Sequence, residues 1–205
     1  MRAYDAYSKY AALFPGREVI DQPLWDTATY TSAATTQLRF FNVTRATLDL
    51  SNMRVAGQLP FPEELYLRSV RVFVKNFAES INVVAAGNIQ TGAADNINRL
   101  ISTAALTLTI GNKNYGIYPL HTLPAGGGAQ PVVNAVNNIL IGGGAVDYAQ
   151  TGRTHVRNNF ALAVPIMIKS QQQFFVDIVW AAALTLTRNV NIQVVLDGDL
   201  IRGIQ

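Results

Sequence analysis

Two histidines and a few carboxylates are the residues of this chain that could take part in catalysis or metal binding. His121 and His155 lie too far apart in sequence to form a local ligand pair, and the chain has no cysteine. A cupin-type metal site requires two histidines one residue apart on a strand, a nearby glutamate and a later histidine, and that pattern is absent. We therefore interpret each histidine as a loop or core residue, and the sequence predicts no cofactor.

The carboxylates show no catalytic arrangement either. Glycosidases need two carboxylates facing each other across a cleft, and Glu63-Glu64 instead follows Pro62 in a predicted turn. Asp177 alternates with apolar residues of a predicted strand, so we expect it to face solvent or to pair with an arginine. Asp197-Gly198-Asp199 indicates a turn, with calcium binding as a remote alternative. Because nucleophile and phosphate-binding motifs are also missing, we expect the protein not to be an enzyme.

The composition is unusual in its low charge. Charged residues make up 14% of the chain, compared with about 25% in an ordinary soluble domain. Polarity is carried by Asn, Gln, Thr and Ser, and such a neutral surface is poorly protected against association because like-charge repulsion is weak. The net charge is +3, and the arginines are scattered without a basic tail, so there is no strong signal for nucleic-acid binding. We expect neighbouring molecules to cover much of the surface.

Most of the chain has the two-residue period of β-strands. Strands are predicted over 38–50 and 66–77, a hairpin over 106–120 with its turn at 111–114, and three closing strands over 160–168, 174–180 and 192–196. Pro165 lacks the N–H that a strand interior needs, which indicates an edge strand or a bulge. The sequence also predicts a short helix over 95–103.

About eight strands without alternating helices exclude a parallel α/β sheet. The pattern predicts an all-β fold, a single jelly-roll β-sandwich of antiparallel strands. The 205 residues suit one such domain. We expect residues 1–37 to form an N-terminal helix and an extended arm, and residues 38–205 to form the sandwich.

Aromatic residues mark the predicted N-terminal helix and arm. Tyr4, Tyr7, Tyr10 and Phe14 recur at three- and four-residue spacing, which places them along one side of a helix, and Trp25 follows in the arm. The sequence leaves three docking surfaces open for them: the same domain, a neighbouring subunit or an underlying membrane. These five residues are the candidate contacts between subunits or with a membrane.

Two segments resemble the major capsid proteins of tailless icosahedral bacterial viruses with jelly-roll shells. One covers residues 38–74, a strand, a Gly-Gln-Leu-Pro break and a second strand, and the other covers residues 172–205 and ends in LDG-x-LIRG-x-Q. The resemblance implies a shell subunit located in the virion that forms capsomers with copies of itself. It further implies N-terminal segments that reach beneath neighbours or toward an internal membrane, with penton or spike proteins as further partners.

The expected function is therefore that of a structural capsid protein that self-assembles into capsomers of an icosahedral particle. The alternative is a carbohydrate- or receptor-binding sandwich, such as the head of a viral spike or fibre. That alternative requires exposed aromatic and amide side chains in loops at one end. Candidates for this role are Tyr115, Tyr118, Tyr148 and Asn158.

Overall fold

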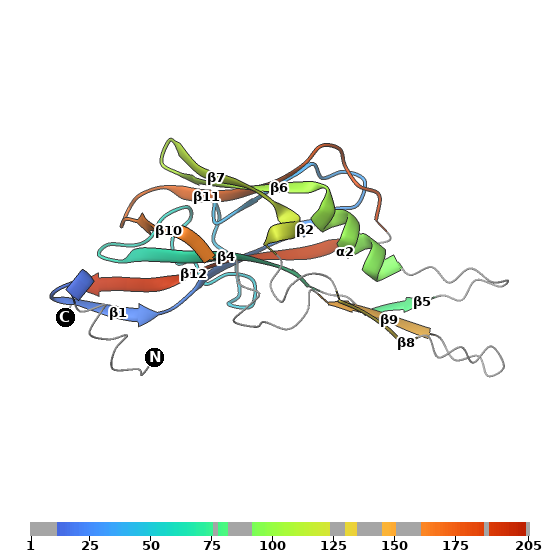
Figure 1. The fold of residues 1–205 in the computed structure, drawn as a ribbon, viewed down its shortest axis with the longest axis horizontal. Coiled ribbons are helices and arrows are strands. Elements are labelled where there is room, and N and C mark those ends of the chain that lie inside the picture. The colour runs from blue at the N-terminus through green and yellow to red at the C-terminus, as the bar shows by residue number, and fades with distance from the viewer. Residues whose placement is uncertain are drawn as a thin grey trace.

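The computed structural model describes residues 12–75, 78–81, 92–123, 130–134, 145–150, 161–186 and 189–203. Two antiparallel sheets pack face to face as a sandwich (Figure 1). Sheet A contains β1 (Arg17–Asp21), β2 (Leu24–Tyr30), β4 (Glu64–Lys75), β10 (Ala161–Ile168) and β12 (Val190–Gly203). Sheet B contains β3 (Gln37–Phe40), β6 (Ala104–Ile110), β7 (Lys113–Pro119) and β11 (Phe174–Trp180). The prediction of an all-β antiparallel sandwich is confirmed.

The strand order is that of a jelly roll. Sheet A runs β2-β12-β4-β10, with β1 continuing the edge beside β12, and sheet B runs β3-β11-β6-β7. Apart from β1, these strands number eight, and the chain crosses from one sheet to the other at each connection between the eight except the β6–β7 hairpin. Two interlocked Greek keys of this kind define the jelly-roll sandwich.

A small extension adds to one end of the sandwich. It consists of α2 (Gly92–Ser102) and a three-stranded antiparallel sheet of β5 (Ala78–Ile81), β9 (Ala145–Gln150) and β8 (Gln130–Asn134) (Figure 1). The predicted helix over 95–103 is confirmed as α2. A hydrogen bond joins this helix to the core, because Trp180 Nε1 donates to the carbonyl oxygen of Leu100 at 3.0 Å.

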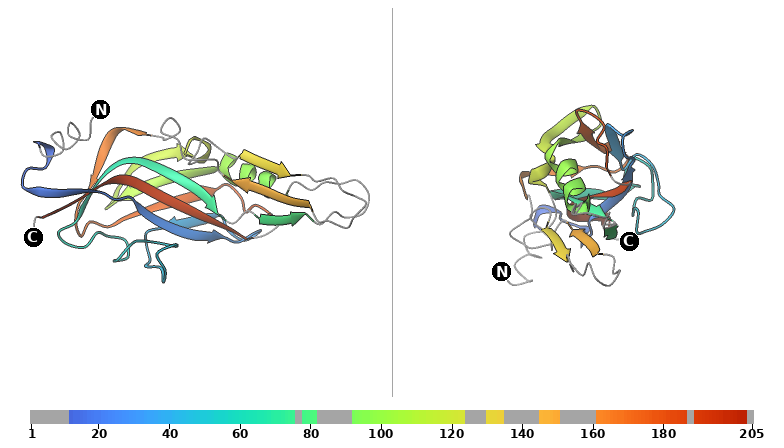
Figure 2. Two further views of the ribbon diagram at one scale, coloured as in Figure 1. Left: turned by 90° about the horizontal axis from the view of Figure 1, so that it is seen from below. Right: turned by 90° about the vertical axis from the view of Figure 1, so that its right-hand side faces the viewer.

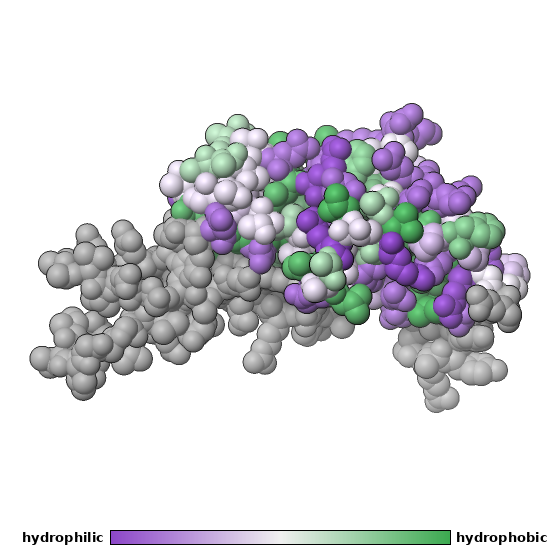
Figure 3. Space-filling model, turned by 180° about the vertical axis from the view of Figure 1, so that it is seen from behind, coloured by the Kyte–Doolittle hydropathy of each residue, from purple (hydrophilic) through white to green (hydrophobic). Residues whose placement is uncertain are grey.

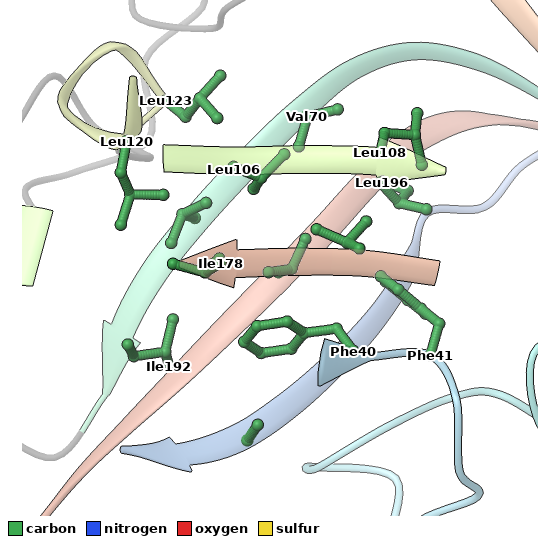
Figure 4. Packing of buried hydrophobic residues seen from close by; sticks show 14 of the residues in the cluster. Phe40, Phe41, Val70, Leu106, Leu108, Leu120, Leu123, Ile178, Ile192 and Leu196 are labelled. Atoms are coloured by element: carbon green, nitrogen blue, oxygen red, sulfur yellow. The ribbon is translucent and has the colours of Figure 1, made fainter. Parts of the chain in front are cut away.

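The core lies between the two sheets and is built from the alternating residues that the strands turn inward. Sheet A contributes Val70, Val72, Ile192, Val194 and Leu196, and sheet B contributes Phe40, Leu106, Leu108, Phe174, Val176, Ile178 and Trp180, all nearly inaccessible to solvent (Figure 4). Burying each such side chain contributes about 1.5–3 kcal/mol. The predicted inward faces of β4, β11 and β12 are confirmed.

The expectation that residues 17–37 form an extended arm is wrong, because most of this segment forms two strands of sheet A. Arg17–Asp21 pairs with the end of β12 and Leu24–Tyr30 pairs with its beginning, so both belong to sheet A. In β2 the sequence hides the pairing because the polar residues Asp26 and Thr27 are buried, which removes the alternation of polar and apolar residues, and β1 has no fully buried residue to mark it.

The predicted strand over 38–50 ends at Phe40. Phe41 has a φ of 66°, which turns the chain out of the sheet, and its N–H donates to the buried carboxylate of Asp26 at 2.7 Å. The Phe41 ring remains in the core against Phe174, with 5.6 Å between ring centroids. Residues 41–63 therefore form a long connection between β3 and β4 despite their strand-like composition.

Two further details of the closing strands differ from the prediction. In β10 the register shifts between Ala161 and Ile166, and Val164, expected on the inward face, is 76% exposed. This strand is an edge strand with a bulge, as Pro165 indicated. Asp197-Gly198-Asp199 is no turn: it lies inside β12, where the register shifts between Asp197 and Gly198.

The bulge at Gly198 generates a stability prediction. A Cβ at this position would overlap the carbonyl oxygen of Tyr66 and lie 2.9 Å from its carbonyl carbon, whereas a Cβ on Gly203 in the same strand meets nothing within 4 Å. We expect Gly198→Ala to lower the free energy of unfolding by about 1–3 kcal/mol because the β4 backbone must move. Urea denaturation of both variants measures this, with Gly203→Ala as the matched control. Equal stability of the two variants would contradict the close approach.

Candidate assembly surface

No group of three or more His, Asp or Glu side chains that could hold a metal ion is found among the residues that the structure describes. His121 is exposed in a short 3-10 helix, η1 (Leu120–Thr122), and His155 lies outside the described residues. Asp177 forms a two-point ion pair with Arg39, which confirms the arginine pairing that the sequence allowed.

The arginines neutralise nearly all of the carboxylates whose side chains are described. Seven arginines pair with eight carboxylates, and the pairs lie both on the flat faces and at the edges of the sandwich. The pairs are Arg17–Glu64, Arg39–Asp177, Arg45–Asp26, Arg54–Glu63, Arg68–Asp21, Arg68–Asp199, Arg71–Asp197 and Arg202–Glu18. The pairing leaves the net charge of +3 unchanged, but it lowers the number of unpaired charges that the described surface presents to a neighbour.

The outer face of sheet B shows what this pairing does locally. Both Arg39–Asp177 hydrogen bonds are 2.8 Å long, and the guanidinium carbon of Arg39 lies 4.0 Å from the centre of the Phe175 ring. The hydrogen bond to Asp177 raises the pKa of Arg39 above its usual value. At the edge of sheet A, the hydrogen bond from Arg202 lowers the pKa of Glu18. Each pair joins one positive and one negative group and so adds no net charge to its surface.

The five aromatic residues predicted to form contacts have different locations. Tyr4, Tyr7 and Tyr10 lie outside the described residues. The Phe14 ring packs edge to face on Tyr66 of β4, with 5.5 Å between centroids, so this residue docks on its own domain. Trp25 is in β2, half-buried, and not in an arm. The structure therefore does not bring Phe14 and Trp25 together on one arm.

Trp25 holds a tight turn that presents an exposed leucine. Its indole N–H donates to the carbonyl oxygen of Leu48 at 2.7 Å, and the N–H of Ser51 donates to the carbonyl oxygen of Thr47 at 3.1 Å. Leu48, at the tip of this turn, is 75% exposed, and Val43 in the same connection is 40% exposed. We call residues 47–51 the leucine turn.

A buried ion pair fixes the approach to the leucine turn. The carboxylate of Asp26, which has no exposure to solvent, accepts hydrogen bonds from Arg45 Nε at 3.0 Å and from the Phe41 N–H at 2.7 Å. Ser51 also forms a β-bridge with Asp26. The connection is thus attached to β2 on both sides of Leu48, which limits the entropy that Leu48 would lose on binding a partner.

An apolar groove lies at the opposite edge of the sandwich. It has a volume of about 630 Å³ and is lined by Tyr115 and Tyr118 of β7 and by residues 162–167 of β10. Val164 is 76% exposed at its rim, and Ile117 on the same strand as the tyrosines is 68% exposed. None of the lining residues is charged. We call this the β7–β10 groove.

The leucine turn and the groove lie on opposite edges. In sheet A the leucine turn borders β2, the groove borders β10, and β12 and β4 lie between them. Both views in Figure 2 show the connection over 41–63 on the side of the sandwich away from β10. The face seen from behind in Figure 3 carries separate hydrophobic residues among polar ones and no continuous apolar patch.

Sequence reasoning missed both of these surfaces. Leu48 belonged to a predicted strand, and Val164 was placed on the buried face of another. Pro165 could have indicated that Val164 is exposed at the β7–β10 groove, since a proline that disrupts pairing also changes which side chains face outward. Of the aromatic and amide residues proposed for carbohydrate binding, Tyr115 and Tyr118 line the groove, Tyr148 is in β9, and Asn158 lies outside the described residues.

Comparison with known proteins gives no relative. No protein-family model matches the chain, and no curated protein and no solved structure matches it. Among the described residues, no helix has the length and apolar character needed to cross a bilayer.

The Asp26–Arg45 pair leads to a second stability prediction. Replacing Arg45 by Met leaves a carboxylate in the core with its charge uncompensated, so we expect a loss of about 3 kcal/mol in the free energy of unfolding at pH 7. The control is Arg202→Met, whose partner Glu18 is half-exposed and can regain water. Urea denaturation compares the two. Losses of equal size would show that Asp26 does not depend on Arg45.

Proposed function

We propose that this protein is a structural shell protein that assembles with copies of itself into capsomers of an icosahedral virus particle. The observation that carries the proposal is the ion pairing: seven arginines satisfy eight carboxylates within one chain. A net charge far from zero is what normally keeps soluble monomers apart, and the net charge of this chain is only +3. A sandwich with so little free charge and with exposed apolar side chains at its edges favours association with its own copies.

The fold supports the same proposal without deciding it. Jelly rolls occur in viral shells, lectins and cupins, so the strand order alone leaves the function open. The cupin function is disfavoured because the described residues contain no cluster of metal ligands. In the proposed particle the partners are copies of the chain, together with penton or spike proteins, and its location is the virion.

The alternative function is binding of a carbohydrate or receptor, and one observation favours it. Tyr115 and Tyr118 line the β7–β10 groove, where aromatic rings offer a stacking surface for a sugar. This function predicts that the purified chain is monomeric and binds a specific glycan. A glycan array without a specific ligand would remove its support.

The shell proposal is tested by the mass of the purified protein. We expect light scattering and negative-stain microscopy to reveal capsomers or closed particles at high protein concentration. The assembly should persist when the ionic strength is raised from about 0.1 M to 1 M, because screening weakens exposed ion pairs but not apolar contacts. A protein that stays monomeric under all these conditions would refute the proposal.

The role of the N-terminal residues is tested by deleting residues 1–11, which removes Tyr4, Tyr7 and Tyr10. Phe14 stays in place against Tyr66, so the melting temperature should change by less than about 4 °C, the shift that corresponds to about 1 kcal/mol or less in a domain of this size. We expect assembly into particles to be lost or strongly reduced. Assembly at the wild-type level would show that these residues are not a contact between subunits. Unfolding of the variant would show instead that they stabilise their own domain.

A further inference from the structure

We propose that the leucine turn of one copy inserts into the β7–β10 groove of the next copy, so that a capsomer forms by head-to-tail contacts between opposite edges of the sandwich. The inference rests on the proposed function and deepens it, because it names the two surfaces that meet. Leu48 is 75% exposed, and the groove of about 630 Å³ is lined by uncharged residues. The occupant of the groove is a second copy of this chain.

The first argument is preorganisation. Leu48 lies at the tip of a hydrogen-bonded turn, and Trp25 and Ser51 attach that turn to β2. A long connection would normally lose much conformational freedom on binding. Since this one is already fixed, the exposed leucine can be buried in a partner at little entropic cost.

The second argument is charge. Arg45, the cation nearest to the leucine turn in sequence, is paired with the buried Asp26, and Asp49 also makes an interaction of its own. The lining of the groove contributes no charged side chain. Insertion of Leu48 and Val43 would therefore bury apolar surface without leaving an ion unpaired, which is the most costly event at an interface.

The third argument is geometry. The leucine turn borders β2 and the groove borders β10, at the two edges of sheet A, so one chain cannot fill its own groove with its own leucine turn. Two different surfaces that meet between identical copies make a heterologous contact, which produces a ring when the rotation closes. A ring of sandwiches joined edge to edge is a capsomer.

Disulfide cross-linking tests the contact directly, because the natural chain contains no cysteine. We would prepare Leu48→Cys and Val164→Cys, mix them under assembly conditions, oxidise the mixture and analyse it on a non-reducing gel. We expect a cross-linked dimer in the mixture, with the peptide pair that joins positions 48 and 164 identified by mass spectrometry, and at least a tenfold lower yield with either variant alone. The double variant should give a ladder whose largest closed species counts the copies in the ring.

The matched control replaces Val179 by cysteine. Val179 is an exposed valine, 43% accessible, on the outer face of sheet B and away from the groove lining. A mixture of Leu48→Cys and Val179→Cys should give no more dimer than either variant alone. Equal cross-linking of Val164→Cys and Val179→Cys partners would indicate random collision and would overturn the proposed contact.

The remaining outcomes separate this inference from the proposed function. If wild-type protein assembles but the mixture of Leu48→Cys and Val164→Cys does not cross-link, the shell proposal stands and the contact proposed here is wrong. A strong dimer of Leu48→Cys with itself would also overturn it, since the contact would then be two-fold symmetric. If the wild-type protein forms no assembly at all, the proposed function fails together with this inference.

Discussion

The pairing of β12 with its neighbours is the constraint on which the rest of the structure depends. This strand of 14 residues pairs with β1 and β2 along one edge and with β4 along the other. At Gly198, where β4 contributes one extra residue to the pairing, the missing side chain allows the β4 backbone to approach closely. Because β10 pairs in turn with β4, the register of β12 fixes which residues reach the two edges of sheet A.

Most of the carboxylates whose side chains are described pair with arginines of the same chain. Most exposed ion pairs contribute little to stability, about 0–1 kcal/mol each, so their chief effect here is to remove free charge from the surface. The exception is Asp26, which is fully buried and holds both Phe41 and Arg45. With electrostatic repulsion and attraction both weakened, shape and apolar contact would decide how copies meet.

The sequence predicted the fold class well and the exposed surfaces poorly. Alternating apolar residues identified β4, β11 and β12, glycine and asparagine identified the β6–β7 hairpin, and Pro165 identified the bulged edge strand. β2 was missed because burial of Asp26 and Thr27 removes the polar alternation, and β1 was missed because none of its residues is fully buried.

The end of β3 was also missed, since a positive φ at Phe41 depends on contacts with residues distant in sequence. Leu48 and Val164 could not be recognised as exposed until the turn and the bulge around them were known. Such local backbone changes reverse the direction of a side chain without altering the composition of the segment.

The chemistry of the groove bears on the choice between the two proposed functions. A sugar presents hydroxyl groups on several sides, and each one that loses water without gaining a partner lowers the affinity. In the groove, β10 contributes the side chains of residues 162–167, all apolar, and β7 contributes two tyrosines. Two phenol groups can form hydrogen bonds with only some of the hydroxyl groups of a sugar. An apolar side chain from another copy requires no polar partner. The lining therefore fits a protein contact better than a glycan, and this favours the shell function over the carbohydrate-binding alternative.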